Sequence, residues 1–325
     1  MDVTSLSLLI GTATDIRQVR VDPTSGSCVN VGTAVPCATN LSLTPDPLRS
    51  VVWSASLDDD GRVSTVHTGP EGPRAGTSSP TGGAVPCHVG LVAAQGSART
   101  VAVANYSGHN VGIVSSIDVT DPRGGATLEA TVDFGEGSHP HQVLPLGNRL
   151  VVSDLGLDSL HLLDRDDPTN ITGRIQLDQG AGPRDAVLIG EHLVVALEVG
   201  NAVGLVQLDR DDDATITGGR QVARHDFTGA PEQTHPSQII ADSRGRALVL
   251  NRGSDTLCVV EVADGRITSV TEHDVPAWPM DLVEVDGTVL VACRDADVVV
   301  ALDLDDPDTE LFRFAVPSPN ALVIL

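Results

Sequence analysis

A strand pattern that recurs along the whole chain constrains the fold of this 325-residue protein more than any other feature. Short runs of Val, Leu, Ile and Ala alternate with turns rich in Gly, Asp and Pro, and almost no window has helical spacing. Each strong apolar run follows a short opening strand and precedes a polar turn, a third strand, an acidic loop and a fourth, less regular strand. The five clearest strong runs are Arg99–Ala104, Arg149–Asp154, His192–Leu197, Ala247–Asn251 and Thr288–Cys293.

The opening strands recur at intervals that match the length of one propeller blade. They begin near residues 37, 86, 139, 182, 235, 278 and 318, so the repeat measures 40 to 53 residues. We therefore predict an all-β, seven-bladed β-propeller with four antiparallel strands in each blade, formed as a single domain by residues 1–325. The C-terminal strand Asn320–Leu325 lacks a following partner, and the N-terminal strands Ser5–Thr12 and Gln18–Val21 lack an opening strand. We expect these three to share one blade that closes the ring and leaves no open edge.

Composition excludes several classes of function. The net charge is −24, and all 20 basic residues are arginine, so chemistry that requires a lysine is excluded. The negative field repels a polyanion, and 2% aromatic residues offer little for bases to stack on, so we expect no nucleic acid partner. No apolar stretch reaches the length of a membrane span, and no basic region precedes Leu6–Ile10 as in a signal peptide. We expect a cytoplasmic protein with no membrane partner, either a monomer or a weak homo-oligomer.

The five cysteines, at positions 28, 37, 87, 258 and 293, form no CxxC pair and match no zinc spacing. We interpret them as reduced, mostly buried thiols. Acidic loops recur after the third strand of each unit, and they resemble calcium loops in their Asp content. The loops are Asp58–Gly61, Asp118–Gly124, Leu163–Pro168, Leu208–Asp213, Asp264–Gly265 and Leu302–Pro307, with Asp22–Pro23 as the seventh. None has the full alternating ligand set with a closing glutamate, so solvated turns capped by Asp side chains are favoured.

A set of short phrases, in order along the chain, resembles the lactonase family of seven-bladed propellers, which includes bacterial 6-phosphogluconolactonases and fungal carboxymuconate-lactonising enzymes. The phrases are GTAT at 11–14, PCHV at 86–89, VANYSGHNV at 103–111, HPHQVLP at 139–145, SDLGLDSL at 153–160, GAGPRD at 180–185, LNRGSD at 250–255 and VPSP at 316–319. The resemblance implies a site at one mouth of the central channel. By position, the family's histidine falls on His141, its two arginines on Arg184 and Arg252, and its glutamate on Glu198.

Further residues are expected to contact the substrate around these four. They are His139, His88, Asn105, Tyr106, Asn251 and His235. Five positions, in four places, depart from the family pattern. Ala55-Ser56 replaces Asn-Glu, Asp185 replaces a histidine, Leu197 replaces an asparagine and Met280 replaces an arginine. These departures leave the four central positions intact and put phosphogluconolactone in question as the substrate.

The residue types suit the opening of a lactone. His141 would act as the base that activates water, because imidazole titrates near neutral pH. Glu198 would orient His141, or serve as base itself if desolvation raised its pKa. Arg184 and Arg252 would hold an anionic substrate and the developing oxyanion. We therefore expect a hydrolase that acts on a small anionic lactone without a metal or other cofactor.

Three alternatives stay open at this stage. The same four groups would serve the reverse reaction, a lactonising cycloisomerase acting on carboxymuconate-type acids. Three of the departures, Ala55-Ser56, Asp185 and Met280, would also fit a propeller that binds without catalysis. Finally, the spacing of His139 and His141, with His88 and His235 in neighbouring openings, would allow a histidine metal cluster, although no carboxylate is placed as an obvious further ligand.

Overall fold

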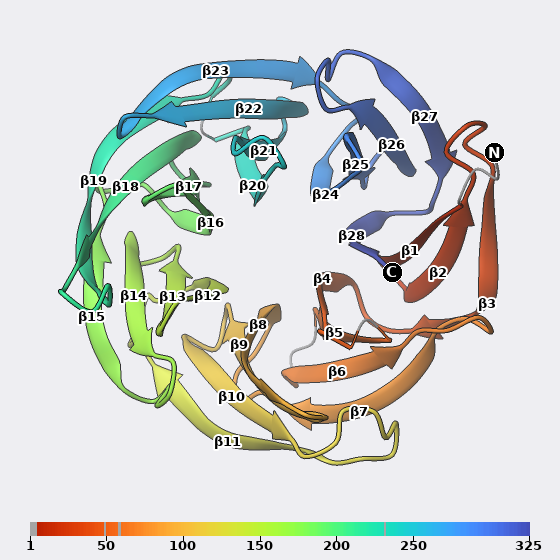
Figure 1. Cartoon of the computed structure of the whole chain (residues 1–325), viewed down its shortest axis with the longest axis horizontal. Coiled ribbons are helices and arrows are strands. Elements are labelled where there is room, and N and C mark those ends of the chain that lie inside the picture. The colour runs from red at the N-terminus through yellow and green to blue at the C-terminus, as the bar shows by residue number, and fades with distance from the viewer. Residues whose placement is uncertain (1–4, 49, 58–59, 231) are drawn as a thin grey trace.

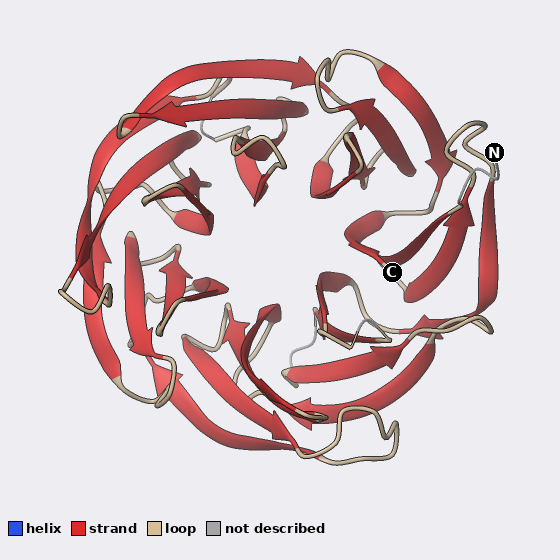
Figure 2. Ribbon diagram, viewed as in Figure 1, coloured by secondary structure: helices blue, strands red, loops and turns tan. Residues whose placement is uncertain are grey.

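The computed structural model describes residues 5–48, 50–57, 60–230 and 232–325, and these residues form seven four-stranded antiparallel sheets arranged as a closed ring (Figures 1 and 2). Among them, no helix is long and apolar enough to cross a membrane. This architecture confirms the predicted all-β, seven-bladed propeller.

Each blade runs from an innermost strand at the channel to an outermost strand at the rim (Figure 1). The first three complete blades along the chain are β4(Asn40–Pro45)–β5(Val51–Ser56)–β6(Arg62–His67)–β7(Arg74–Pro80), β8(Pro86–Gln95)–β9(Ala98–Asn105)–β10(Asn110–Ser116)–β11(Ala126–Asp133) and β12(Pro140–Leu146)–β13(Arg149–Asp154)–β14(Ser159–Asp164)–β15(Ile171–Gln176). The next three are β16(Pro183–Ile189)–β17(His192–Leu197)–β18(Ala202–Arg210)–β19(Ile216–Asp226), β20(His235–Ala241)–β21(Ala247–Arg252)–β22(Thr256–Ala263)–β23(Arg266–Asp274) and β24(Pro279–Val285)–β25(Thr288–Cys293)–β26(Val298–Asp303)–β27(Glu310–Ala315).

The remaining blade joins the two ends of the chain, as the sequence predicts. Its order is β28(Pro319–Ile324)–β1(Leu6–Thr12)–β2(Asp15–Val21)–β3(Cys28–Pro36). Strand β28 pairs antiparallel with β1, with Leu8 opposite Ile324 and Gly11 opposite Ala321. The ring is therefore closed by backbone hydrogen bonds, and the inner edge of β1 is not left unpaired.

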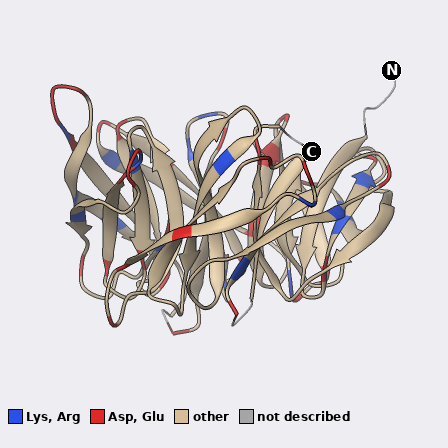
Figure 3. Cartoon of the chain, turned by 90° about the horizontal axis from the view of Figure 1, so that it is seen from below, with Lys and Arg blue, Asp and Glu red and all other residues tan. Residues whose placement is uncertain are grey.

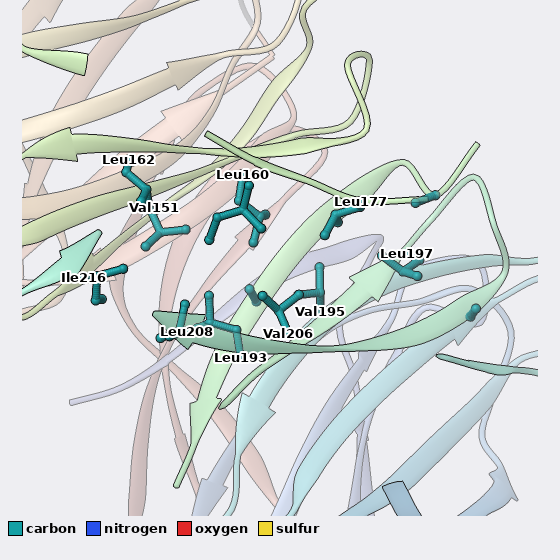
Figure 4. Packing of buried hydrophobic residues seen from close by; sticks show 14 residues of the cluster. Val151, Leu160, Leu162, Leu177, Leu193, Val195, Leu197, Val206, Leu208 and Ile216 are labelled. Atoms are coloured by element: carbon teal, nitrogen blue, oxygen red, sulfur yellow. The ribbon is translucent and has the colours of Figure 1, made fainter. Parts of the chain in front are cut away.

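The second and third strands of each blade are buried on both faces, because neighbouring blades pack face to face. Strand β17 is buried at five consecutive residues, Leu193 to Leu197, whereas the outer strand β11 alternates between exposed and partly buried side chains. One packing cluster, shown in Figure 4, joins Val151 and Leu160 of one blade to Leu193 and Val195 of the next. A continuous aliphatic run is therefore the sequence signature of a strand whose two faces are both covered by neighbouring blades.

A buried ion pair also joins two blades. Arg99 of β9 donates from Nε and Nη2 to the two carboxylate oxygens of Asp46, at 2.6 and 2.8 Å. The two side chains are 2% and 0% exposed. Because both charges are removed from water, the attraction between them has to offset the free energy of their desolvation.

Most of the predicted acidic loops lie between the third and fourth strands, and many acidic residues of the chain lie in loops (Figure 3). Their Asp carboxylates accept backbone hydrogen bonds two residues ahead, as Asp118 does from Thr120 and Asp303 from Asp305. This confirms the interpretation as capped turns. The placement of Asp58–Gly61 was wrong, because this segment lies between the second and third strands β5 and β6; its residues 58 and 59 lie outside the described residues.

Candidate active site

A β-bulge near the start of the innermost strand shapes the channel in all seven blades. In six blades the pairing with the second strand skips one residue immediately after the first pair, and in the β20 blade it skips two residues after the second pair. The skipped residues are Leu41, Cys87, His141, Arg184, Ser237 with Gln238, Met280 and Asn320. A bulged residue is released from the alternation of the strand, so its side chain can be aimed differently from those of its neighbours. His141 and Arg184 both owe their positions to this feature.

The bulged residues surround one end of a channel cavity of about 470 Å³. Its polar lining includes His88, His141, Arg184, Asp185 and Asp281. The rest of its wall is mainly apolar and comes from the same innermost strands. The cavity is large enough for a small organic molecule and places several titratable groups on its surface.

His141 is held by a carboxylate from the neighbouring blade. Its Nδ1 lies 3.2 Å from Oδ1 of Asp185, and both side chains are nearly buried. Burial and the Arg184 guanidinium lower the pKa of His141, and the hydrogen bond that it donates to the Asp185 carboxylate opposes them. His141 is therefore a neutral imidazole at neutral pH, with Nδ1–H donated to the Asp185 carboxylate. In the described part of the chain the contact with Asp185 is the one hydrogen bond of the His141 ring, so the lone pair on Nε2 is free to accept a proton.

Glu198 lies between the two arginines. One carboxylate oxygen accepts from Nη1 of Arg184 at 2.7 Å, and the other lies 3.0 Å from Nη2 of Arg252. Burial opposes ionisation, but the two guanidiniums outweigh it and lower the pKa of Glu198 to about 2. Two expectations about Glu198 are therefore wrong. It does not orient His141, which Asp185 does, and it is too acidic to act as a base.

The two arginines differ in their electrostatic setting. Burial and the nearby Arg184 lower the pKa of Arg252 to about 10, with Glu198 opposing the change. Burial also disfavours the charged form of Arg184, but Glu198 and Asp185 outweigh it and raise the pKa of Arg184. Both side chains therefore carry positive charge at neutral pH.

The chain's one tyrosine lies beside the histidines of the site. Tyr106 stacks on His139 with ring centroids 4.6 Å apart. Its ring is nearly perpendicular to that of His141, with the two centroids 6.1 Å apart. Nδ1 of His139 lies 3.0 Å from the carbonyl oxygen of Tyr106. The structure thus places His139 and Tyr106 beside His141, and their contact with substrate stays a prediction.

His88 contributes its side chain to the channel wall, whereas His235 contributes its backbone. Nδ1 of His88 accepts a hydrogen bond from the Val143 amide at 3.3 Å, and burial lowers its pKa to about 4, so it is a neutral group of the channel wall. His235 precedes the first proline of β20, and its carbonyl oxygen accepts from Nε of Arg252 at 3.3 Å. Its backbone therefore contributes to holding Arg252.

Asn105 and Asn251, both expected to contact substrate, are fully buried. Asn105 donates to the carbonyl of Thr81 and to the side chain of Asn110. Asn251 donates to the side chain of Asn201 in the adjacent blade at 3.3 Å. These two expectations are corrected, because buried amides of this kind secure the turns and blades and have no surface left for a ligand.

Two site features escaped the sequence reasoning. Asp185 was noticed only as a missing histidine, although it is the partner of His141. Trp278 and Arg294 were not considered, although the Arg252 and Arg294 guanidiniums lie 5.9 and 5.0 Å from the centroid of the Trp278 ring. The chain has two tryptophans, and Trp278 stands directly before an opening strand. This position was the signal in the sequence that could have pointed to it. Within the described ranges, no three or more His, Cys, Asp or Glu residues are grouped so that they could hold a metal ion. All five cysteines are free, and three of them are buried.

Comparisons with known proteins agree with this architecture. The periplasmic gluconolactonase PpgL of Pseudomonas aeruginosa is 20% identical and superposes with a TM-score of 0.84 over 99% of each chain. A Bacteroides fragilis NCTC 9343 protein, provisionally described as a 6-phosphogluconolactonase, is 19% identical with a TM-score of 0.82, covering 100% of this chain and 98% of that one. A Lactobacillus plantarum protein is 22% identical with a TM-score of 0.79, covering 99% and 100%. At such identities the likeness shows the fold.

A search of curated protein sequences returned no match. The family model described as "Lactonase, 7-bladed beta-propeller", in contrast, matches residues 7–324. Because this match spans almost the whole described ring, the chain belongs to the lactonase family of seven-bladed β-propellers.

Proposed function

We propose that the protein is a lactonase that opens a sugar-type or carboxylated lactone by attack of water, with His141 as the general base. The observation that carries this proposal is the free Nε2 of His141, on a neutral imidazole fixed by Asp185 and next to the Arg184 guanidinium. Family membership supports the reaction class.

In the proposed reaction, Nε2 of His141 takes a proton from water as the water oxygen attacks the lactone carbonyl carbon. The negative charge that develops on the carbonyl oxygen is stabilised by Arg184. Arg252 shares the Glu198 carboxylate with Arg184, so Glu198 does not neutralise Arg184 alone. The ring carbon–oxygen bond then breaks. The imidazolium returns its proton to the leaving alkoxide, which gives the open hydroxy acid.

Asp185 has a supporting role in this scheme. Its carboxylate holds the Nδ1–H tautomer, which keeps the lone pair on Nε2, and it stabilises the imidazolium that forms during attack. Glu198 neutralises part of the charge of two buried guanidiniums and fixes their forks. We further propose that the substrate is a small anionic lactone held by the Arg184 and Arg252 guanidiniums, and that the protein has no nucleic acid or membrane partner. We also propose a cytoplasmic location, to be checked by fractionation of the source cells.

The test is direct assay of lactone opening, with spontaneous hydrolysis subtracted. The panel should include glucono-1,5-lactone, 6-phosphoglucono-1,5-lactone and a carboxylated lactone, each followed by acid release. We expect His141→Gln to lower kcat/KM by roughly 100-fold or more, since a positioned base contributes about 10² to 10⁴. His225→Gln, an exposed histidine of the outer strand β19, is the matched control.

The outcomes separate the activity from the residue assignment. A wild-type protein that opens none of these lactones would overturn the proposed activity. Turnover that survives His141→Gln would instead show that another group is the base. Incubating the open acids with the protein at low pH measures the reverse reaction, which is ring closure. The same variants test which residues it needs.

A further inference from the structure

Equivalent positions in successive blades form a ring around the mouth of the channel. In five blades the residue that follows the second strand donates its backbone N–H to the residue before the innermost strand. In the β20 blade the corresponding residue is Arg252, the last residue of β21, which pairs with His235 in the ladder. We call these residues the mouth ring. Its described members are Leu57, Tyr106, Leu155, Glu198, Arg252 and Arg294.

Three consecutive blades place charged residues in the mouth ring. Glu198 and Arg252 belong to the proposed site, and Arg294 occupies the same position in the next blade. The Arg294 amide donates to the carbonyl of Trp278 at 3.0 Å, as the Glu198 amide does to Gly182 at 2.8 Å. The repeat of the fold therefore places the Arg294 side chain next in line after Arg252.

Arg294 has capacity left for a ligand. Its side chain is 35% exposed, and its carboxylate partner is the adjacent Asp295, which is 50% exposed. Only Nε takes part in that hydrogen bond, at 2.7 Å, so in the described structure both terminal nitrogens remain without a partner. An exposed pair of this kind contributes little stability, so the guanidinium can be recruited by an anion without a large loss.

Trp278 connects Arg294 to Arg252. Both guanidiniums lie over its indole ring, at 5.0 and 5.9 Å from the centroid. The residue has a φ of 60°, and its amide donates to the Asp255 carboxylate at 2.9 Å. The equivalent residues Val85, Gly182 and Ser318 of other blades have a similar positive φ, so this conformation belongs to the repeat of the fold. The indole places an aromatic face under both guanidiniums.

The charges around Trp278 favour an anion beside the two guanidiniums. Each guanidinium has one carboxylate partner, Glu198 for Arg252 and Asp295 for Arg294. Arg294 still lowers the pKa of Arg252, after burial and Arg184, so a bound anion would reduce the remaining repulsion between the two cations. In addition, Nε1 of Trp278 is a buried donor with no acceptor in the described structure.

We propose that Arg294 and Trp278, together with Arg252, form a subsite for an anionic substituent of the substrate, a phosphate or carboxylate remote from the lactone carbonyl. This inference rests on the proposed lactonase function and specifies its substrate class. Arg294, directly after the second strand β25, supplies a cation in the blade whose innermost strand β24 carries Met280. A phosphorylated sugar lactone therefore remains compatible with the site.

Binding can be measured without catalysis because the chain has two tryptophans, and Trp53 is 1% exposed in the core. Trp278 should therefore dominate any change in intrinsic fluorescence when an anion binds at the mouth. The probes are 6-phosphogluconate, gluconate and inorganic phosphate, which separate a substituent phosphate from a free one. We expect a saturable change with 6-phosphogluconate and binding about tenfold weaker for gluconate.

The variants test each residue in turn. Arg294→Gln should weaken 6-phosphogluconate binding about tenfold and lower, by a similar factor, the kcat/KM ratio of phosphorylated to neutral lactone. Trp278→Phe should abolish the fluorescence change while calorimetry still detects binding. Arg220→Gln, an exposed arginine of the outer strand β19, is the control.

Each result decides the proposal. An unchanged kcat/KM ratio and unchanged 6-phosphogluconate affinity in Arg294→Gln would overturn the subsite even if lactones are opened. A protein that opens no lactone but binds 6-phosphogluconate through Arg294 would support the subsite and overturn the hydrolytic function. Equal binding of phosphate alone in wild type and Arg294→Gln would also count against the subsite.

Discussion

His141 and Asp185 lie on the innermost strands of neighbouring blades, and their side chains meet with Nδ1 3.2 Å from Oδ1. The pair thus spans a blade interface, and its geometry depends on how β12 packs against β16. A histidine that is buried, neutral and oriented by a carboxylate has the arrangement expected of a general base.

Replacing the carboxylate should separate orientation from electrostatics. The Asp185 hydrogen bond and charge raise the pKa of His141 against burial and Arg184, so Asp185→Asn should lower that pKa further. We expect the acid limb of the kcat/KM profile to move to lower pH, while kcat falls roughly 100-fold because the tautomer is no longer fixed. Asp308→Asn, which alters an exposed His–Asp pair with His273, is the matched control. A limb that moves to higher pH would refute the assigned base.

Removing the charge of Glu198 should destabilise the protein and create sensitivity to anions. Glu198→Gln leaves Arg184 and Arg252 as buried cations without their shared carboxylate, and we expect a loss of about 3 kcal/mol in the free energy of unfolding. Sulfate or phosphate should recover part of this loss by replacing the carboxylate. Thermal melts with and without sulfate measure both effects, and Glu191→Gln, whose side chain is 81% exposed, should behave as wild type. Equal melting temperatures for Glu198→Gln and wild type would contradict the assigned compensation.

The ion pair between Arg99 and Asp46 predicts coupling between two blades. Arg99→Met leaves a buried carboxylate unpaired and should cost about 3–5 kcal/mol, measured by urea unfolding. The double variant Arg99→Met, Asp46→Asn should lose less than the sum of the two single variants, because it leaves no isolated charge. Strictly additive losses would mean that the two groups act independently.

Asp281 provides a prediction about stability and pH. Burial raises its pKa to about 7, although the Leu322 and Leu282 amides donate to it. Between about pH 4 and pH 7 the folded state therefore binds a proton that the unfolded state releases, so this group makes stability fall as pH rises. Asp281→Asn removes the ionisable group while keeping an acceptor. Its advantage over wild type should be greatest above pH 7, at most about 4 kcal/mol, and shrink towards pH 4. Unfolding curves that stay parallel at all pH values would disprove this.

The fold could be predicted from the sequence because the strand and turn patterns that specify a blade are local and recur along the chain. The run His192–Leu197 coincides with β17, and the paired ends of the chain followed from counting strands per unit. The four central site residues were found through their motifs, and the structure brings them into one connected set. What neither periodicity nor motif could predict is which side chains meet across blades, since Asp185 and His141 are 44 residues apart.

The errors at Asn105 and Asn251 have a related cause. Both belong to distinctive phrases, and a distinctive polar residue can mark either a ligand contact or a buried turn. Their complete burial and their hydrogen bonds to neighbouring turns depend on packing that a linear pattern does not encode. Glu198 was misjudged for the same reason, because the number of guanidiniums around it sets its pKa.

The bulges of the innermost strands have a consequence for how such a channel can diversify. Each skipped residue, such as His141, Arg184 or Met280, stands outside the paired register of its blade. Its identity can change without altering which residues pair in the ladder, so chemistry and folding are separated at seven equivalent places. A library of variants confined to these positions should therefore yield folded rings with different ligand preferences. The residue of each blade can be varied separately.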